Sequence, residues 1–214
     1  MSGIRYRSRG PVFEFLLDHP DLAASIARAL RLGGYRVTPL GDGYWGDDNR
    51  GARGRIRILH AEPGRRLLHL EGRYEARRLP VIEGQLLVLL EYRHETDDQG
   101  GGVVEQSLTG HLRIDTPIAG AVAQLAAAIS RPLVERAVER KVRRFFNTVA
   151  RVSRWAYDQP EQLAMALEGH PEVPESTTLA TFRAILLADR HPAWANVPFH
   201  LTPETPVTPS SLSD

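Results

Sequence analysis

The segment from 117 to 157 constrains the fold of this chain more than any other feature of its sequence. It follows Thr116-Pro117, a helix-start signal, and its second half gathers apolar residues on one narrow arc at helical spacing, with arginines on the opposite arc. The apolar positions are Val134, Val138, Val142, Phe145, Val149, Val152 and Ala156. At about 1.5 Å per residue such a helix is roughly 60 Å long, so it needs a large apolar surface to pack against.

A series of strand-like segments ahead of this helix supplies that surface. The segments run over 35–40, 53–60, 67–75, 85–95 and 103–115, and turn-forming residues such as Gly41-Asp42-Gly43 and Glu62-Pro63-Gly64 separate them. Short connections of this kind predict hairpins, and therefore an antiparallel sheet. We also expect an opening strand at 4–9, a helix near 12–17, and a second helix from an N-cap at Asp21 to Leu32.

The chain divides into three parts by pattern and charge. Residues 1–157 form the main domain, residues 158–191 a helical extension with helices at 161–167 and 178–188, and residues 192–214 a proline-rich, flexible tail. Eight basic and two acidic residues lie between 131 and 157, whereas eight acidic and two basic residues lie between 158 and 214. One hypothesis is that the acidic extension folds back along the arginine face of the long helix.

Composition limits the class of protein. Hydrophobic residues make up 42% and charged residues 25%, which is typical of a packed globular domain. The absence of cysteine excludes disulfides and thiolate chemistry. The N-terminus carries no secretory h-region, and no apolar run of about 18 residues occurs, so a cytoplasmic location is expected.

The predicted order of elements resembles that of the START-like superfamily, also called SRPBCC. Two helices lie between a first strand and an antiparallel meander, and a long amphipathic helix follows. The resemblance covers about residues 4–157. It implies an α+β helix-grip fold, in which a curved antiparallel sheet wraps around a long C-terminal helix, here with an additional short helical extension. Members hold an apolar ligand between sheet and helix, and they include lipid-transfer domains, quinone-binding proteins, and polyketide cyclases and aromatases.

Strand alternation is consistent with such a pocket. It places Tyr74, Tyr92, His94 and Gln106 on the same faces as apolar residues, so we expect their polar atoms to project into an apolar space. The expected ligand-binding residues are Leu70, Tyr74, Val88, Leu90, Tyr92, His94, Gln106, Leu108, Phe145 and Val149. The alternative is that each polar group is hydrogen-bonded within an ordinary core or lies at the rim of the sheet.

Three functions remain open at this stage. The preferred one is non-catalytic binding or transfer of a hydrophobic small molecule such as a lipid, isoprenoid, quinone or polyketide. The second is a cyclase- or dehydratase-like enzyme that uses Tyr92, His94 or Glu91 for acid–base chemistry. The third is a protein-interaction module without a ligand. No catalytic residue is assigned.

Other site chemistries find little support in the sequence. His69 and His111 alternate onto the face opposite His94, so neither a metal site nor a cofactor is expected. The stretch 41–49 has the glycines and carboxylates of a calcium loop but lacks its closing glutamate, which favours a solvated turn. Ser107 and His111 are about 13 Å apart along one strand, too far for proton transfer.

The arginines of the long helix form the most distinctive surface. Their positive charge is suited to peripheral contact with an anionic membrane, and the alternative is a face that only meets water. The residues concerned are Arg136, Arg140, Arg143, Arg151 and Arg154. Nucleic acid is not expected as a partner, because exposed aromatic residues are not interleaved with these charges.

Overall fold

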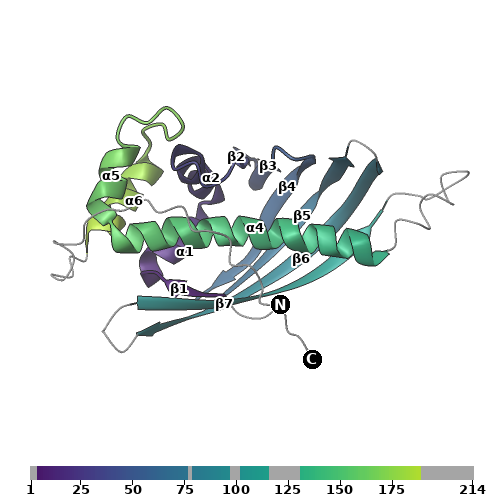
Figure 1. Ribbon diagram of the computed structural model, residues 1–214, viewed down its shortest axis with the longest axis horizontal. Helices are drawn as coiled ribbons and strands as arrows, with labels where there is room; N and C mark the ends of the chain where they lie inside the picture. Colours follow the sequence, from purple (N-terminus) through teal and green to yellow (C-terminus); the bar gives the residue numbers. More distant parts are fainter. Residues whose placement is uncertain (1–3, 77–78, 97–101, 116–130, 189–214) are drawn as a thin grey trace, which may run out of the picture.

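The computed structural model describes residues 4–76, 79–96, 102–115 and 131–188, which together form an α+β fold (Figure 1). The described strands build one antiparallel sheet in the order β1-β7-β6-β5-β4-β3-β2. They are β1 (Ile4–Arg7), β2 (Arg36–Leu40), β3 (Gly43–Asp47), β4 (Ala52–Glu62), β5 (Arg65–Ala76), β6 (Leu79–Thr96) and β7 (Gly102–Ile114). The described helices are α1 (Gly10–Asp18), α2 (Pro20–Ala29), α4 (Arg131–Asp158), α5 (Pro160–Leu167) and α6 (Thr177–Ala188).

The predicted strands and the antiparallel pairing are confirmed, and one strand was missed. Residues 43–47, which the sequence analysis assigned to a solvated turn, form β3, which pairs with β2 through a tight turn at Gly41-Asp42. Gly41 has a φ of +61°, a left-handed conformation that glycine adopts without steric cost. The predicted N-cap at Asp21 is also wrong, because α2 begins one residue earlier with Pro20 in its first turn and His19 at the N-cap.

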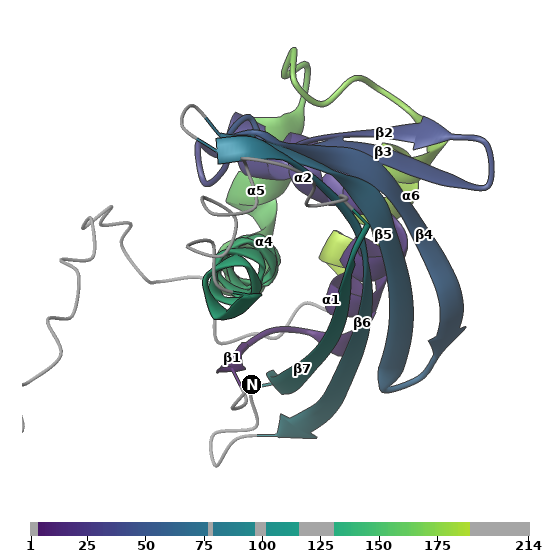
Figure 2. The same cartoon turned by 90° about the vertical axis from the view of Figure 1, so that its right-hand side faces the viewer.

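Glycines aligned across four strands allow the sheet to bend. Gly46 pairs with Gly54, Gly54 with Gly72, and Gly72 with Gly84. A Cβ atom added at Gly72 would lie 2.4 Å from the carbonyl oxygen of Arg53, so this close approach of backbones excludes any side chain there. Figure 2 shows the resulting curvature, with α4 lying inside the concave face of the sheet.

One hydrophobic core joins the sheet, the early helices and the C-terminal helices. Phe13 and Ile26, from α1 and α2, are fully buried together with Leu90 of β6. Phe182 of α6 belongs to the same cluster and is also fully buried, with its ring centre 6.0 Å from that of Phe15. The extension after 158 is therefore packed into the core of the main domain.

The two faces of α4 have the expected environments. Val149, Val152 and Ala156 are buried, whereas Arg136, Arg140, Arg143, Arg151 and Arg154 are all exposed. The hypothesis that the acidic extension covers this arginine face is thus wrong for the described part of the chain. Among the described acidic residues of the extension, Asp158 lies 3.5 Å from Arg154 one turn away on α4 itself, and Glu172 pairs with Arg28 of α2 at 2.6 Å.

Some sequence-based expectations concern residues that the structure does not describe. The first part of the predicted long helix, 117–130, and the proline-rich tail, 192–214, lie outside the described residues. Among the helices that are described, none combines the length and the apolar character needed to cross a membrane.

Candidate ligand-binding cavity

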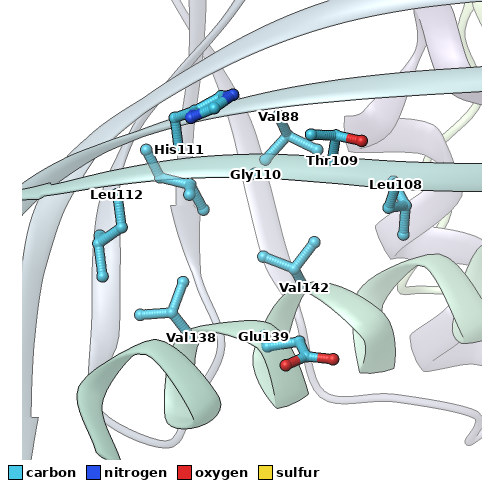
Figure 3. Close-up of a pocket in the computed structure, with 10 residues that line it drawn as sticks. Val88, Leu108, Thr109, Gly110, His111, Leu112, Val138, Glu139 and Val142 are labelled. Atoms are coloured by element: carbon cyan, nitrogen blue, oxygen red, sulfur yellow. The ribbon is translucent and has the colours of Figure 1, made fainter. Parts of the chain in front are cut away.

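A cavity of about 640 Å³ lies between α4 and the β6–β7 pair (Figure 3). Its lining residues are Leu86, Val88, Leu108, Thr109, Gly110, His111, Leu112, Val138, Glu139 and Val142. Pockets for small molecules usually enclose roughly 300 to 1,000 Å³, so this volume accommodates an organic ligand rather than a few water molecules.

The side chains that face the cavity are mainly apolar. The register of β6 and β7 pairs Leu86 with Leu112 and Val88 with Gly110, and alternation turns these positions toward α4. His111 has the opposite parity, and Figure 3 shows its ring pointing away from α4. The cavity is therefore bounded here by the backbone of residues 109–111 and not by the imidazole ring of His111.

Glu139 is the one carboxylate of the lining, and it belongs to the rim. Its side chain is 43% exposed, and its Oε1 accepts a hydrogen bond from Arg143 Nη2 at 2.9 Å along the outer surface of α4. Among the described residues, no group of three or more histidine, aspartate or glutamate side chains is arranged to hold a metal ion.

The cavity reaches solvent along β7. Gly110, which has the inward parity, is exposed, and Leu112 and Val142 at the cavity are only half-buried. Gly110 faces inward, and a Cβ atom added there would find its nearest neighbour, Leu86 Cδ1, at an ordinary contact distance of 3.5 Å. The absence of a side chain at this position leaves space that a larger residue would fill.

The predicted apolar site residues divide between the cavity and the core. Val88 and Leu108 line the cavity. Leu90 is fully buried and Val149 is 4% exposed, and both are packed within the core, while Leu70 and Phe145 are partly buried against it. Whether Val88 and Leu108 contact a ligand stays a prediction.

Three of the predicted polar residues lie at the other end of the concave face, beneath α1. Tyr92 is buried, and its hydroxyl donates to Glu14 Oε1 at 3.3 Å. Burial raises the pKa of Tyr92, so this hydroxyl remains protonated at neutral pH. Gln106, which is 1% exposed, accepts a hydrogen bond from the hydroxyl of Tyr6 at 3.4 Å.

His94 corrects the expectation of a side chain that projects into an apolar interior. Its side chain is 36% exposed, and its Nε2 lies 3.3 Å from the same Glu14 oxygen. Its ring meets the edge of Phe13, with ring centres 6.1 Å apart. Because α1 packs over this end of β6, the residue closes the end of the sheet rather than lining the cavity.

Tyr74 lies on the concave face near the opposite flank of α4. The Lys141 ammonium nitrogen is 4.6 Å from the centre of the Tyr74 ring, within the range of a cation–π contact. The same ammonium forms an ion pair with Asp48. Tyr74 therefore helps to fix α4 on the sheet and is not among the residues that line the large cavity.

Sequence reasoning did not select four of the side chains that form the cavity, Leu86, Leu112, Val138 and Val142. The signals were present, since alternation places the two leucines on the inward face and helical spacing places the two valines on the apolar arc of α4. The sequence does not show which half of a concave face another helix occupies. Here α1 fills the half near Tyr92 and leaves the half near Leu86 open.

Comparisons with known proteins do not assign this chain to a family. No family model matches the sequence, and no curated protein matches it. Among solved structures, one similar chain is that of a conserved protein from Geobacillus kaustophilus, at 14% identity and a TM-score of 0.45. The match covers 70% of this chain and 91% of that chain. A likeness of this size assigns neither a fold family nor a function.

Proposed function

We propose that the protein binds a hydrophobic small molecule, of the lipid, isoprenoid, quinone or polyketide class, in the cavity between α4 and β6–β7. The observation that carries this proposal is an unfilled space of about 640 Å³ faced by leucine and valine side chains. Transfer of these side chains from water to contact with an apolar guest is favourable by roughly 25 cal/mol per Å² of apolar surface. The opening along β7 provides a path for entry and release, which suits binding or transfer.

The proposal includes a helix-grip fold of the START-like superfamily and a cytoplasmic location. Support for the fold comes from the order of elements, with α1 and α2 between β1 and the remaining strands and α4 after the last strand. Further support comes from the strand order, which places β1 beside β7. In such an arrangement the ligand lies between the long helix and the sheet, where the cavity is found.

The positions of ionisable groups favour binding over catalysis. Tyr92 and His94 lie beneath α1, away from the cavity, and neither is among its lining residues. Glu91 has the outward parity and pairs with Arg65 at 3.2 Å on the outer face of the sheet. A cyclase- or dehydratase-like reaction needs such a group within hydrogen-bonding reach of the substrate. The cavity also favours small-molecule binding over a protein-interaction module, because such a module does not require an unfilled interior.

The exposed arginines of α4 support a second part of the proposal, peripheral contact with an anionic membrane. All five predicted side chains extend from one helix and are accessible to lipid headgroups. Each is expected to contribute about 1 kcal/mol near a strongly anionic surface. In this arrangement the protein would approach a membrane through α4 while the cavity on the flank of the helix receives or releases its guest.

Filling the cavity from Gly110 tests the proposed function. We expect Gly110→Leu to weaken binding of the neutral apolar dye Nile red roughly tenfold, about 1.4 kcal/mol, because the new side chain occupies the space of the guest. The matched control is Ser107→Leu, which adds the same side chain on the opposite face of β7 at a position that does not line the cavity. Fluorescence titration measures both, and the unfolding transition of each variant reports whether it is folded.

Native mass spectrometry of the purified protein supplies a second measurement. A copurifying apolar molecule that is retained by Ser107→Leu, and is lost from Gly110→Leu or replaced there by a shorter one, supports the proposal. Equal Nile red affinity in the three proteins, all of them folded, would overturn it.

A further inference from the structure

A second, smaller cavity lies on the flank of α4 opposite the first. It encloses about 80 Å³ between the 32–35 loop, the 48–50 turn and the α4 residues Lys141, Arg144 and Thr148. A single buried water needs roughly 10 to 15 Å³ measured in this way, so the space accommodates a small polyatomic group. It does not share a lining residue with the cavity on the β7 side.

Asp48 organises this site while its own charge is neutralised. Its Oδ1 accepts hydrogen bonds from the backbone N–H groups of Arg50 and Ala52, both at 2.8 Å, and its Oδ2 pairs with Lys141. These bonds fix the turn that carries Arg50 against the helix that carries Arg144. The carboxylate and the ammonium cancel, so the two arginines determine the net charge of the cavity.

Arg50 and Arg144 provide two guanidinium groups without an assigned counter-ion. Both residues are exposed and line the cavity, and no ion pair to either guanidinium is found within the described part of the chain. Both charges act on the hydroxyl of Tyr35 at this cavity, and two unneutralised cations this close to one site repel each other unless an anion lies between them. Guanidinium groups donate in a planar fork that matches the oxygens of phosphate.

A buried hydroxyl faces the same space. The oxygen of Tyr35 is buried and, within the described residues, makes no hydrogen bond of acceptable geometry. The neighbouring hydroxyl of Thr148 donates to the carbonyl oxygen of Arg144 at 2.9 Å, and although it lies close to the Tyr35 hydroxyl, the two do not meet in hydrogen-bonding geometry. A buried hydroxyl without a partner costs about 1 to 3 kcal/mol, a cost that an acceptor in the cavity would remove.

We propose that this second cavity binds a phosphate group, with Arg50 and Arg144 as charged donors and Tyr35 as a neutral donor. The group belongs either to free inorganic phosphate or to a phosphomonoester such as a lipid headgroup, since both present the same tetrahedral anion. Binding here is independent of the apolar guest, because the two cavities lie on opposite flanks of α4.

Titration of the full chain with inorganic phosphate and, separately, with glycerol 3-phosphate tests the proposal. Chemical shifts of the backbone amides of Gly33, Gly34 and Asn49, followed by NMR at constant ionic strength, are expected to change saturably. In the double variant Arg50→Gln/Arg144→Gln the affinity should fall at least tenfold. Arg151→Gln is the matched control, because it removes an exposed arginine that lies on α4 two helical turns beyond Arg144 and does not line the cavity.

The two ligands distinguish the sources of the group. Similar affinities identify the phosphate group alone as the ligand, whereas tighter binding of glycerol 3-phosphate identifies a phosphomonoester, and either result supports the site. A third variant, Tyr35→Phe, should weaken binding without removing charge. The proposal is overturned if neither ligand gives a saturable change below roughly 100 mM, where exposed charges are already screened. It is equally overturned if Arg151→Gln weakens binding as much as the double variant does.

Discussion

At the scale of single residues, Lys141 connects more parts of the molecule than its position on a helix surface suggests. It is the sole lysine of the sequence, among 27 basic residues. Its ammonium pairs with Asp48 after β3 and lies over the ring of Tyr74 from β5. The Lys141 and Asp48 side chains are only 25% and 14% exposed, so their attraction is screened less than that of a surface pair. Lys141 thus fixes α4 to both the edge and the centre of the sheet.

Removal of this ammonium should leave a partly buried carboxylate without its counter-ion. We expect Lys141→Met to lower the free energy of unfolding by about 1 to 3 kcal/mol, measured by urea denaturation. In the double variant Asp48→Asn/Lys141→Met the loss should be smaller than the sum of the two single losses, because the unpaired charge is gone. Strict additivity of the two losses would contradict the assigned ion pair.

At the scale of elements, the glycines of the sheet have two different roles. Those aligned across β3 to β6 allow backbones to approach closely, whereas Gly110 of β7 leaves room for a side chain. At Gly72 a Cβ atom would meet the carbonyl oxygen of Arg53 at 2.4 Å, a contact that only a shift of the backbone can relieve. At Gly110 of β7 the nearest atom is the end of a leucine side chain at 3.5 Å. The same residue type therefore serves opposite purposes in neighbouring parts of one sheet.

Alanine at these two glycines should change stability in opposite directions. Gly72→Ala is expected to lower the free energy of unfolding by roughly 3 kcal/mol, because the added methyl group forces paired strands apart. Gly110→Ala should raise it by about 0.5 kcal/mol, since glycine in a strand loses more conformational entropy on folding than alanine does. Chemical denaturation of both variants measures the contrast, and equal changes would refute the assignment of Gly72 to the bend.

At the scale of the whole molecule, the extension after 158 completes the core. Its buried residues, Leu163, Leu167, Leu179, Phe182 and Leu186, belong to one cluster with α1, α2, α4 and the sheet. Sequence patterns placed the two short helices closely but gave no sign of where they pack, because helical periodicity identifies an apolar face without its partner. The charge imbalance suggested the arginine face of α4 as that partner, yet apolar contact with α1 prevailed.

The same limit explains the remaining differences between sequence and structure. Alternation and helical spacing identified the inward residues of β6, β7 and α4, from which the existence of a sheet and a long helix followed. The strand at 43–47 was missed because its glycines and aspartates are typical of turns, while Tyr44 and Trp45 pair across to β4. Tyr92 and His94 were selected for their chemistry, although α1 decides that this end of the face is filled.

Truncation of one extension side chain should destabilise the entire protein. We expect Phe182→Ala to lower the free energy of unfolding by about 3 to 5 kcal/mol, because removal of the ring leaves an empty space in the core that all elements share. Unfolding should remain a single cooperative transition. Met165→Ala is the control: Met165 is 72% exposed, so its loss should change stability by less than about 0.5 kcal/mol. An early, separate transition confined to the extension would show that it folds independently.

Gly110 also bears on how this protein can diversify. Because the position tolerates a side chain without backbone strain, and because that side chain would enter the cavity, one codon change reduces the volume of the cavity while every strand stays in place. Under the proposed binding function, descendants of this chain would therefore change the size of the molecule they bind more readily than they change the fold.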